Sequence, residues 1–168
     1  MGELVTQPFD VSDLAAEVRS SGADLTAILG PFVLIGDGRQ EPSRAFLFLT
    51  TEATPFGGAE PSPFADSVVF GLRKRTARFG DVVLVGRADS NDVTIQHTSI
   101  SKLHARLRDF DEDGFTVEDA GSRNGTFLNQ ARVLAPTRVS CGDVLCFGRR
   151  AFRVRRTDRL VKALGVHR

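Results

Sequence analysis

The sequence predicts a mainly β protein, an antiparallel β-sandwich with a small mixed α/β appendage before it and a short helix after it. Three observations lead to this fold class. After Phe64, short β-favouring segments follow one another about every eight to twelve residues. Turn residues separate these segments, and no helical pattern lies between them. Many short strands arranged in this way are typical of antiparallel sandwiches and barrels.

Residues 10–30 predict two short helices. Their apolar residues recur at three- and four-residue intervals, and Ser20-Ser21-Gly22 interrupts the pattern. Ser12 is the candidate N-cap of the first helix, since a serine hydroxyl can accept a hydrogen bond from the first turn. Gly30-Pro31 ends the second helix, because glycine supports a left-handed cap and proline cannot continue a helix.

Two short apolar runs follow, Phe32 to Ile35 and Ala45 to Leu49, and both predict buried strands. Residues 54–63 hold three prolines and two glycines, which is typical of a linker or an irregular loop. We therefore expect three parts, namely an acidic N-terminal appendage at 1–64, a β-sandwich domain at 65–157 and a C-terminal helix at 158–168.

Within the expected sandwich, we predict eight strands. They are Ser67 to Leu72, Val82 to Gly86, Val93 to Ile95, Ala105 to Phe110, Phe115 to Glu118, Thr126 to Leu128, Val144 to Phe147 and Ala151 to Val154. Asp113-Gly114, Asn124-Gly125 and Gly142-Asp143 supply turn signals between them. Leu160, Val161 and Leu164 then recur at helical spacing, which predicts the final helix.

The composition points to a soluble protein of the cytoplasm. The chain has 168 residues, of which 41% are hydrophobic and 26% charged, and it contains no run of about 18 apolar residues that could cross a membrane. Its first residues are acidic rather than basic and apolar, so we expect no signal peptide. The two cysteines, Cys141 and Cys146, provide no disulfide framework. No cofactor is expected.

The formal net charge of +1 conceals an asymmetry along the chain. Residues 1–72 carry a net charge of −7, whereas residues 73–168 carry +8. Such a difference points to an interaction surface on one part of a chain. We therefore expect the C-terminal part to bind an anionic group.

Four sequence features between residues 86 and 129 carry the chemistry. They are Gly86-Arg87, Asn91-Asp92, the segment Ser99 to Ala105 and the segment Asp119 to Phe127. In this order and spacing, on a β-rich background, they strongly resemble a forkhead-associated (FHA) domain over about residues 65 to 156. The resemblance implies an FHA/SMAD-like β-sandwich that binds phosphothreonine. It implies a threonine-phosphorylated protein or peptide as the partner, for example a Ser/Thr kinase or one of its substrates.

The residue types indicate an anion site even when the family resemblance is set aside. A phosphate dianion requires fixed cations and hydrogen-bond donors, and the guanidinium of an arginine matches its oxygens well. Arg87 follows a predicted strand and can offer that guanidinium from a loop. Ser101 can offer a hydroxyl and a backbone N–H from a second loop.

The resemblance assigns roles to the remaining residues. Asn124 would bond the backbone of the bound peptide, while Lys102 and Arg123 would flank the phosphate and influence the choice of peptide side chains. Support of the binding loops would come from four residues, Gly86, His104, Gly125 and Thr126. Phosphopeptide contact is thus expected from Arg87, Ser101, Lys102, Arg123 and Asn124, with no catalytic residue and no metal ligand.

Other interpretations of the same residues remain open. Ser101, His104 and Asp119 could form a hydrolase triad, but serine and histidine only three residues apart, without a Gly-x-Ser-x-Gly motif, favour this little. Cys141 and Cys146 lack the spacing of a zinc site with His97 or His104, so packed thiols are expected.

Two alternatives concern the function as a whole. One is a scaffold or assembly protein that uses the same sandwich for contacts that do not depend on phosphate. The other is a nucleic-acid binder that uses the arginines between Arg149 and Arg156; because Phe152 and Val154 alternate with them, a strand is the expected interpretation and nucleic acid is not the expected partner. Thr50, Thr51 and Thr54 lie before the sandwich, and a phosphothreonine there could occupy the protein's own site.

Overall fold

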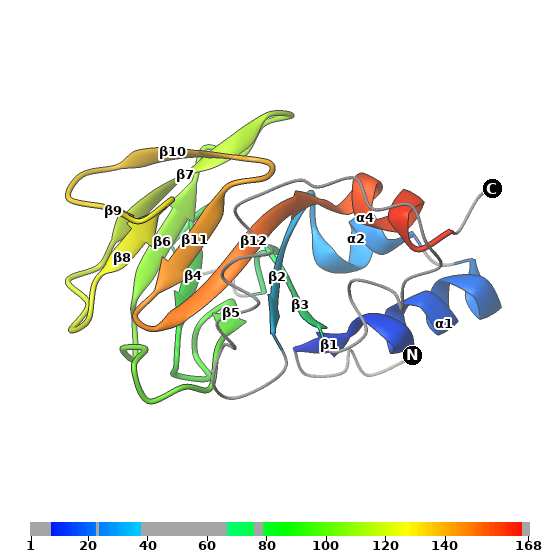
Figure 1. Ribbon diagram of the computed structural model, residues 1–168, viewed down its shortest axis with the longest axis horizontal. Coiled ribbons are helices and arrows are strands. Elements are labelled where there is room, and N and C mark those ends of the chain that lie inside the picture. The colour runs from blue at the N-terminus through cyan, green and yellow to red at the C-terminus, as the bar shows by residue number, and fades with distance from the viewer. Residues whose placement is uncertain (1–7, 23, 38–66, 76–78, 166–168) are drawn as a thin grey trace.

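The strands of the computed structural model form two sheets that face each other, and the model describes residues 8–22, 24–37, 67–75 and 79–165 (Figure 1). The larger sheet has seven strands in the order β1-β3-β2-β12-β11-β8-β9. Their bounds are Phe9–Asp10 (β1), Phe32–Asp37 (β2), Ser67–Gly71 (β3), Thr126–Leu128 (β8), Ala131–Arg132 (β9), Val144–Phe147 (β11) and Arg150–Arg156 (β12).

The smaller sheet has five strands in the order β10-β7-β6-β4-β5. Their bounds are Val83–Gly86 (β4), Val93–Thr94 (β5), Ala105–Arg108 (β6), Gly114–Asp119 (β7) and Thr137–Ser140 (β10). The predicted mainly β sandwich is therefore confirmed. Every strand pair of the described residues is antiparallel except β4 with β5, which is parallel.

The space between the two sheets holds the main core. Its largest fully buried side chains include Phe32, Phe115, Phe147 and Phe152. Phe32 meets Phe115 edge-on with the ring centroids 5.6 Å apart. In a chain without Trp or Tyr, phenylalanines supply the aromatic packing of this core.

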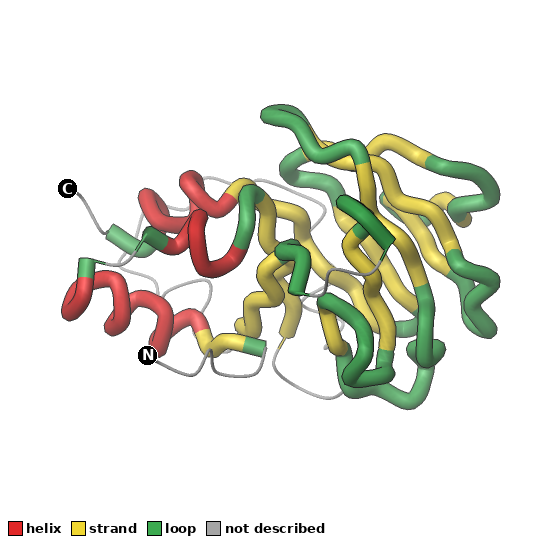
Figure 2. The backbone as a smooth tube through the Cα atoms, turned by 180° about the vertical axis from the view of Figure 1, so that it is seen from behind, coloured by secondary structure: helices red, strands yellow, loops and turns green. Residues whose placement is uncertain are grey.

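Helices of the described residues cover the outer face of the seven-stranded sheet at one end of the molecule (Figures 1 and 2). They are Val11–Ser21 (α1), Leu25–Leu29 (α2) and Thr157–Ala163 (α4). A second core cluster joins them to Val33, Ile35 and Val69 of the sheet. Phe32 and Leu34 point to the opposite face, between the sheets. The first four residues of β2, Phe32 to Ile35, are all apolar because both faces of the strand are covered there.

Strand β2 lies in the interior of the larger sheet, between β3 and β12. The segment before residue 65 thus contributes backbone hydrogen bonds and side chains to the sandwich itself. The division of the chain at residues 64 and 65 stays a prediction. The predicted strand Ala45 to Leu49, the linker at 54–63 and the three threonines Thr50, Thr51 and Thr54 lie outside the described residues.

The start of the first helix differs from the prediction. Asp10, and not Ser12, is its N-cap, because Asp10 has extended backbone angles and its Oδ1 accepts a hydrogen bond from the N–H of Ser12 at 2.8 Å. Serine therefore lies inside the first turn. Gly22 ends the helix with a φ of +62°, as a left-handed cap, so the predicted break between the two helices is confirmed.

Three strands have no counterpart in the prediction, namely β1, β9 and β10. Strands β1 and β9 contain two residues each, too few to show an alternating pattern. Strand β10 begins directly after Pro136. Because proline is a turn signal, the sequence favours a turn at this point. In the part of the chain that the structure describes, no helix is long and apolar enough to span a bilayer.

Candidate functional site

Three loops meet at one end of the sandwich, and we call them the site loops. They are residues 87–92 after β4, residues 97–104 before β6 and residues 120–125 after β7. Strands β4, β6 and β7 are neighbours in one sheet, so their ends lie side by side. The sheet therefore brings the predicted Arg87, Ser101 and Asn124 to the same edge.

The first two site loops approach each other closely at Gly86. A Cβ atom at this position would overlap the carbonyl oxygen of Lys102, so only glycine fits. Asn91 strengthens the same contact, since its Nδ2 donates to the carbonyls of Ala88 at 2.8 Å and Lys102 at 2.6 Å. Gly86 and Asn91 thus hold the two loops together, which agrees with the supporting role expected for Gly86.

Asp92 bonds the end of the first site loop to the interior of the protein. Its carboxylate is fully buried and accepts hydrogen bonds from the N–H groups of Arg75 at 2.7 Å and Leu84 at 2.9 Å. The ammonium of Lys74 lies 3.1 Å from the same carboxylate. The Asn91-Asp92 pair singled out in the sequence is therefore structural, because its polar atoms bind the protein itself.

Ser101 lies where the three site loops join. Its carbonyl accepts from the N–H of Arg87 at 2.9 Å, and its Oγ accepts from the N–H of Arg123 at 3.0 Å. Because the hydroxyl serves here as an acceptor, its own proton remains available to a ligand. The Nε of Arg87 donates to the carbonyl of Ile100 at 3.1 Å, which orients the guanidinium along the second loop.

His104 is buried beneath these loops and fastens two of them. Its Nδ1 accepts from the N–H of Ser101 at 3.1 Å, and its Nε2 lies 2.9 Å from the carbonyl of Gly125. This pair of contacts defines the neutral tautomer with the proton on Nε2. Burial lowers the pKa of His104 from its usual value, although the bond to Gly125 and the charge of Asp119 act in the opposite direction.

The geometry excludes a hydrolase triad built on these residues. His104 uses Nδ1 for the backbone N–H of Ser101 and Nε2 for a carbonyl, so neither ring nitrogen is left for the Ser101 hydroxyl. The carboxylate of Asp119 instead accepts from the hydroxyls of Ser122 at 2.6 Å and Thr126 at 2.7 Å. His104 therefore cannot act as a general base for this serine.

Asp119 organises the third site loop. Burial would raise the pKa of its carboxyl, but the hydrogen bonds from Ser122 and Thr126 outweigh burial and hold the pKa below its usual value. Thr126 is fully buried, which fits the supporting role expected for it. Ser122, which was not among the predicted site residues, also accepts from the N–H of Gly125 at 3.0 Å.

Asn124 connects the second and third site loops. Its Nδ2 donates to the carbonyl of Ser99 at 2.8 Å, while its side chain is exposed. The amide oxygen remains free to accept a hydrogen bond from a bound peptide. Gly125 follows with a φ of +86°, the conformation that the Asn-Gly turn predicts.

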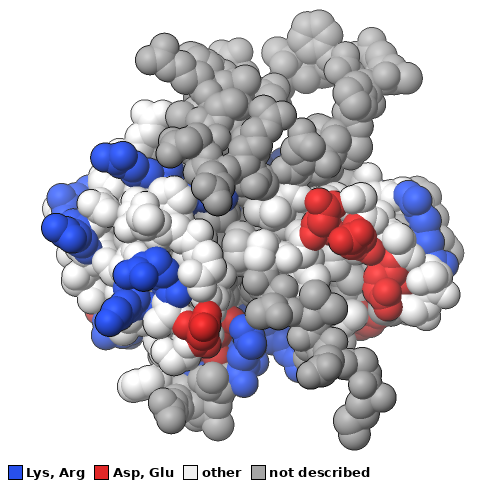
Figure 3. Space-filling model, turned by 90° about the horizontal axis from the view of Figure 1, so that it is seen from below, with Lys and Arg blue, Asp and Glu red and all other residues white. Residues whose placement is uncertain are grey.

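The edge formed by the site loops is basic. Arg87, Lys102 and Arg123 have exposed side chains, and none of them forms an ion pair with a carboxylate of the described residues. Figure 3 views the molecule from this end, and several Lys and Arg side chains lie over the sandwich half, on the left. The electrostatic character suits an anionic ligand.

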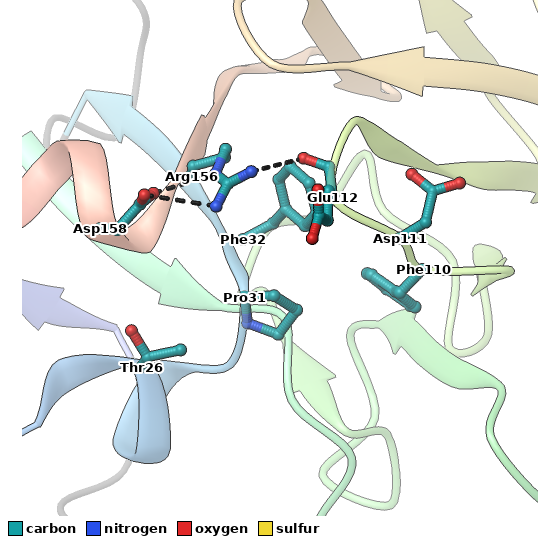
Figure 4. A pocket seen from close by; sticks show the side chains of 8 residues that line it. All are labelled: Thr26, Pro31, Phe32, Phe110, Asp111, Glu112, Arg156 and Asp158. Carbon is teal, nitrogen blue, oxygen red and sulfur yellow. Dashed lines mark hydrogen bonds and ion pairs between the residues drawn. The ribbon is translucent and has the colours of Figure 1, made fainter.

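A cavity of about 310 Å³ opens at the other end of β6 and β7 (Figure 4). It is lined by Thr26, Pro31, Phe32, Phe110, Asp111, Glu112, Arg156 and Asp158. Arg156, its one cation, already donates to Asp158 at 3.0 Å and to the carbonyl of Glu112 at 2.7 Å. With three carboxylates on its rim, this cavity disfavours a phosphate.

Cys141 and Cys146 are both free thiols. Burial raises the pKa of Cys146 to about 11, which agrees with a packed thiol. Among the residues that the structure describes, no cluster of three or more His, Cys, Asp or Glu side chains could hold a metal ion.

Known proteins resemble this chain over the same region. Residues 83–148 match the family model of the FHA domain. The chain is 38% identical over 73 residues to the FHA domain-containing protein FhaB of Mycobacterium tuberculosis, a match that covers 44% of this chain and 46% of FhaB. It is 36% identical over 89 residues to Kanadaptin of Homo sapiens, covering 46% of this chain and 12% of Kanadaptin. The chain thus spans less than half the length of these curated relatives.

A solved structure from a structural and functional analysis of phosphothreonine-dependent FHA domain interactions is 26% identical to this chain, with a TM-score of 0.44. The match covers 52% of this chain and 82% of that chain. The family model begins with β4 and ends at Gly148, and so includes all three site loops. The sequence resemblance is therefore confirmed, since residues 83–148 of this chain match the model of the FHA domain family.

Proposed function

We propose that this chain is a phosphothreonine-binding module without catalytic activity, which acts as an adaptor in Ser/Thr kinase signalling in the cytoplasm. One observation carries the proposal. Ser101, with a hydroxyl proton available to a ligand, is bonded through its own atoms to the backbones of Arg87 and Arg123. A hydroxyl between two arginines matches the needs of a phosphate dianion. The FHA family match of the same loops supports this assignment.

In this proposal all three site loops contribute to phosphate binding, and the third also holds the peptide backbone. Arg87, Ser101, Lys102 and Arg123 bind the phosphate oxygens and any acidic groups near them. Asn124 accepts a hydrogen bond from the peptide backbone through its free amide oxygen and thereby sets the register of the peptide. His104 contacts no ligand, because both of its nitrogens are used inside the protein.

A titration with three ligands tests the proposal. A library of phosphothreonine peptides, the same peptides without phosphate and a DNA oligonucleotide are each titrated with the full chain. We expect affinity for a subset of the phosphorylated peptides only, and the affinity should fall with added salt since part of the attraction is ionic. Equal affinity for both peptide forms would indicate a phosphate-independent scaffold. Preference for the oligonucleotide would indicate a nucleic-acid binder.

Two variants assign the binding to the site. Arg87→Ala and Ser101→Ala should abolish phosphopeptide binding and leave the circular dichroism spectrum unchanged, because both side chains reach the surface of the loops. Ser20→Ala is the matched control, since Ser20 is exposed on α1 at the other end of the molecule. Unchanged affinity in Arg87→Ala or in Ser101→Ala would contradict the assigned roles.

A further inference from the structure

The basic run from Arg149 to Arg156 is divided by the structure into residues with different surroundings. Arg150 is buried, with its guanidinium 6.0 Å from the ring centroid of Phe152. Arg153 is half-buried and donates to the carbonyl of Gly142 at 3.1 Å, and Arg156 pairs with Asp158. Arg149 differs from these three because its side chain is exposed, in the turn between β11 and β12.

That turn lies against the site loops (Figure 1). The N–H of Gly148 donates to the carbonyl of Gly125 at 2.9 Å, and the N–H of Arg149 donates to the Oγ of Ser99 at 3.0 Å. Gly148 has a φ of +59°, and a Cβ atom there would overlap the carbonyl of Ser99. The backbone of Arg149 is therefore held in a fixed position beside the second and third site loops.

Arg149 and Asn124 both donate a hydrogen bond to Ser99. The hydroxyl of Ser99 accepts from the N–H of Arg149, and its carbonyl accepts from the side-chain amide of Asn124. Under the proposed function Asn124 holds the peptide backbone, so the side chain of Arg149 starts next to the bound peptide. Ser101, where the phosphate would bind, is two residues farther along the loop. The backbone of Arg149 is thus bonded to the residue that holds Asn124, and not to Ser101.

The guanidinium of Arg149 is available for a ligand. Within the described residues it has no carboxylate at ion-pair distance and no hydrogen-bond acceptor. A guanidinium forms two parallel hydrogen bonds with a carboxylate, which a lysine cannot do. We propose that Arg149 is a specificity-determining residue of the phosphopeptide site and selects peptides with an Asp or Glu side chain near the phosphothreonine. This inference rests on the proposed function and extends the site one residue beyond the family match.

A peptide scan tests the inference. One phosphothreonine peptide that binds is prepared with alanine at its flanking positions, and a single Glu is then placed at each of these positions in turn. Fluorescence anisotropy measures the affinity of the wild-type chain, of Arg149→Ala and of Arg149→Glu. Arg159→Ala is the matched control, because Arg159 is exposed on α4 away from the site loops.

We expect one Glu position to raise the affinity of the wild type about fivefold, the factor that corresponds to about 1 kcal/mol for an ion pair near the surface. Arg149→Ala should lose this gain and bind the alanine peptide as the wild type does. Arg149→Glu should prefer Lys at the same position. The control variant should keep the preference for Glu.

The outcomes separate this inference from the proposed function. If the wild type and Arg149→Ala bind phosphopeptides with the same preference for Glu, or if neither prefers Glu, the role of Arg149 is wrong and the phosphopeptide function stands. If Arg149→Ala weakens every phosphopeptide equally, Arg149 is a general phosphate cation and the inference is likewise overturned. If the wild type binds no phosphothreonine peptide, the proposed function fails and this inference fails with it.

Discussion

The Nδ1 atom of His104 accepts a hydrogen bond from the backbone N–H of Ser101 across 3.1 Å. A protonated imidazole carries hydrogen on both nitrogens and cannot accept this bond. The position of Ser101 at the centre of the proposed site therefore depends on a neutral ring. Burial, which lowers the pKa of His104, keeps the ring neutral at pH 7.

The first prediction concerns the stability of the protein between pH 7 and pH 5. Since the pKa of His104 is lower in the folded chain than in the unfolded chain, the unfolded chain binds the extra proton in this range. The contribution of His104 is complete above about pH 6.5 and is lost as the pH falls below that value. Urea unfolding at pH 7, 6 and 5 should show a falling free energy of unfolding. Circular dichroism is the suitable signal, because the chain lacks Trp and Tyr.

His104→Gln is the control for this prediction, since an amide can donate and accept but does not titrate near pH 6. The variant should be less stable than the wild type at pH 7 by about 1–3 kcal/mol, because a buried group loses part of its hydrogen bonding. It should also lose less stability between pH 7 and pH 5. Carboxylates such as Asp119, with pKa values below the usual range, act only at lower pH. Parallel pH profiles in the two proteins would contradict the role of His104.

The second prediction concerns the hydroxyl of Thr126. Thr126 is fully buried and donates to Oδ1 of Asp119 at 2.7 Å, and Asp119 also binds Ser122. Thr126→Val keeps the shape of the side chain and removes one donor, so we expect a loss of about 1–2 kcal/mol in the free energy of unfolding. Phosphopeptide affinity should fall as well, since the carboxylate of Asp119 holds the loop that carries Asn124.

Thr137→Val serves as the comparison for this variant. The Thr137 hydroxyl donates to the carbonyl of Ala135 in a partly exposed position, far from Asp119 in the sequence and outside the site loops. Its replacement should change stability by less than about 0.5 kcal/mol and leave peptide binding unaltered. An equal effect of the two substitutions on peptide affinity would speak against a supporting role for Thr126.

The third prediction concerns strand β2. A chain that begins at residue 65 lacks β2, and with it Phe32 and Leu34 of the inter-sheet core. It also leaves the facing edges of β3 and β12 without a partner. We expect this shortened chain to show no cooperative thermal unfolding. A cooperative transition would instead support the predicted division of the chain at residues 64 and 65.

Single substitutions in β2 test the same point in the full chain. Leu34 and Val33 are both fully buried, on the inter-sheet face and on the helix-covered face respectively. Leu34→Ala should lower the free energy of unfolding by about 2–5 kcal/mol, as for other large-to-small changes in a core. Val33→Ala should also destabilise the protein, because α1, α2 and α4 cover that face. A neutral Val33→Ala would indicate that the helices contribute little.

The sequence predicts those elements of the fold that are determined by residues close together in the chain. Strands such as β6 and β7 have four or more residues with the alternating or apolar patterns of strands, and the sequence predicts them. Strand β2 is also predictable as a strand, but its neighbours β3 and β12 are distant in the chain, so its place inside the sheet is not. The Asp10 cap was missed because Ser12 has an equally suitable side chain two residues later.

The site divides in the same way. Arg87, Ser101 and Asn124 stand in motifs whose spacing carries the family resemblance, and the fold brings their loops together. Arg149 lies in no such motif, and its contact with Ser99 joins residues 50 positions apart. Only the pairing of β11 with β8 and β12 places its turn beside the site loops. A basic run in the sequence could not distinguish this arginine from Arg150, which is buried.

The fourth prediction concerns the reactivity of the two thiols. With a pKa of about 11, only about one Cys146 side chain in a thousand is ionised at pH 8, and the thiolate is the reactive form. Iodoacetamide at pH 8 should therefore leave Cys146 unmodified in the folded chain, and mass spectrometry of peptides can locate any label. In the Cys141→Ser variant labelling should be slow until urea unfolds the protein, after which it should reach one label per chain. Rapid labelling of the folded variant would mean that Cys146, which lies partly buried on the face of β11 opposite to Leu145 and Phe147, is more accessible than the structure shows.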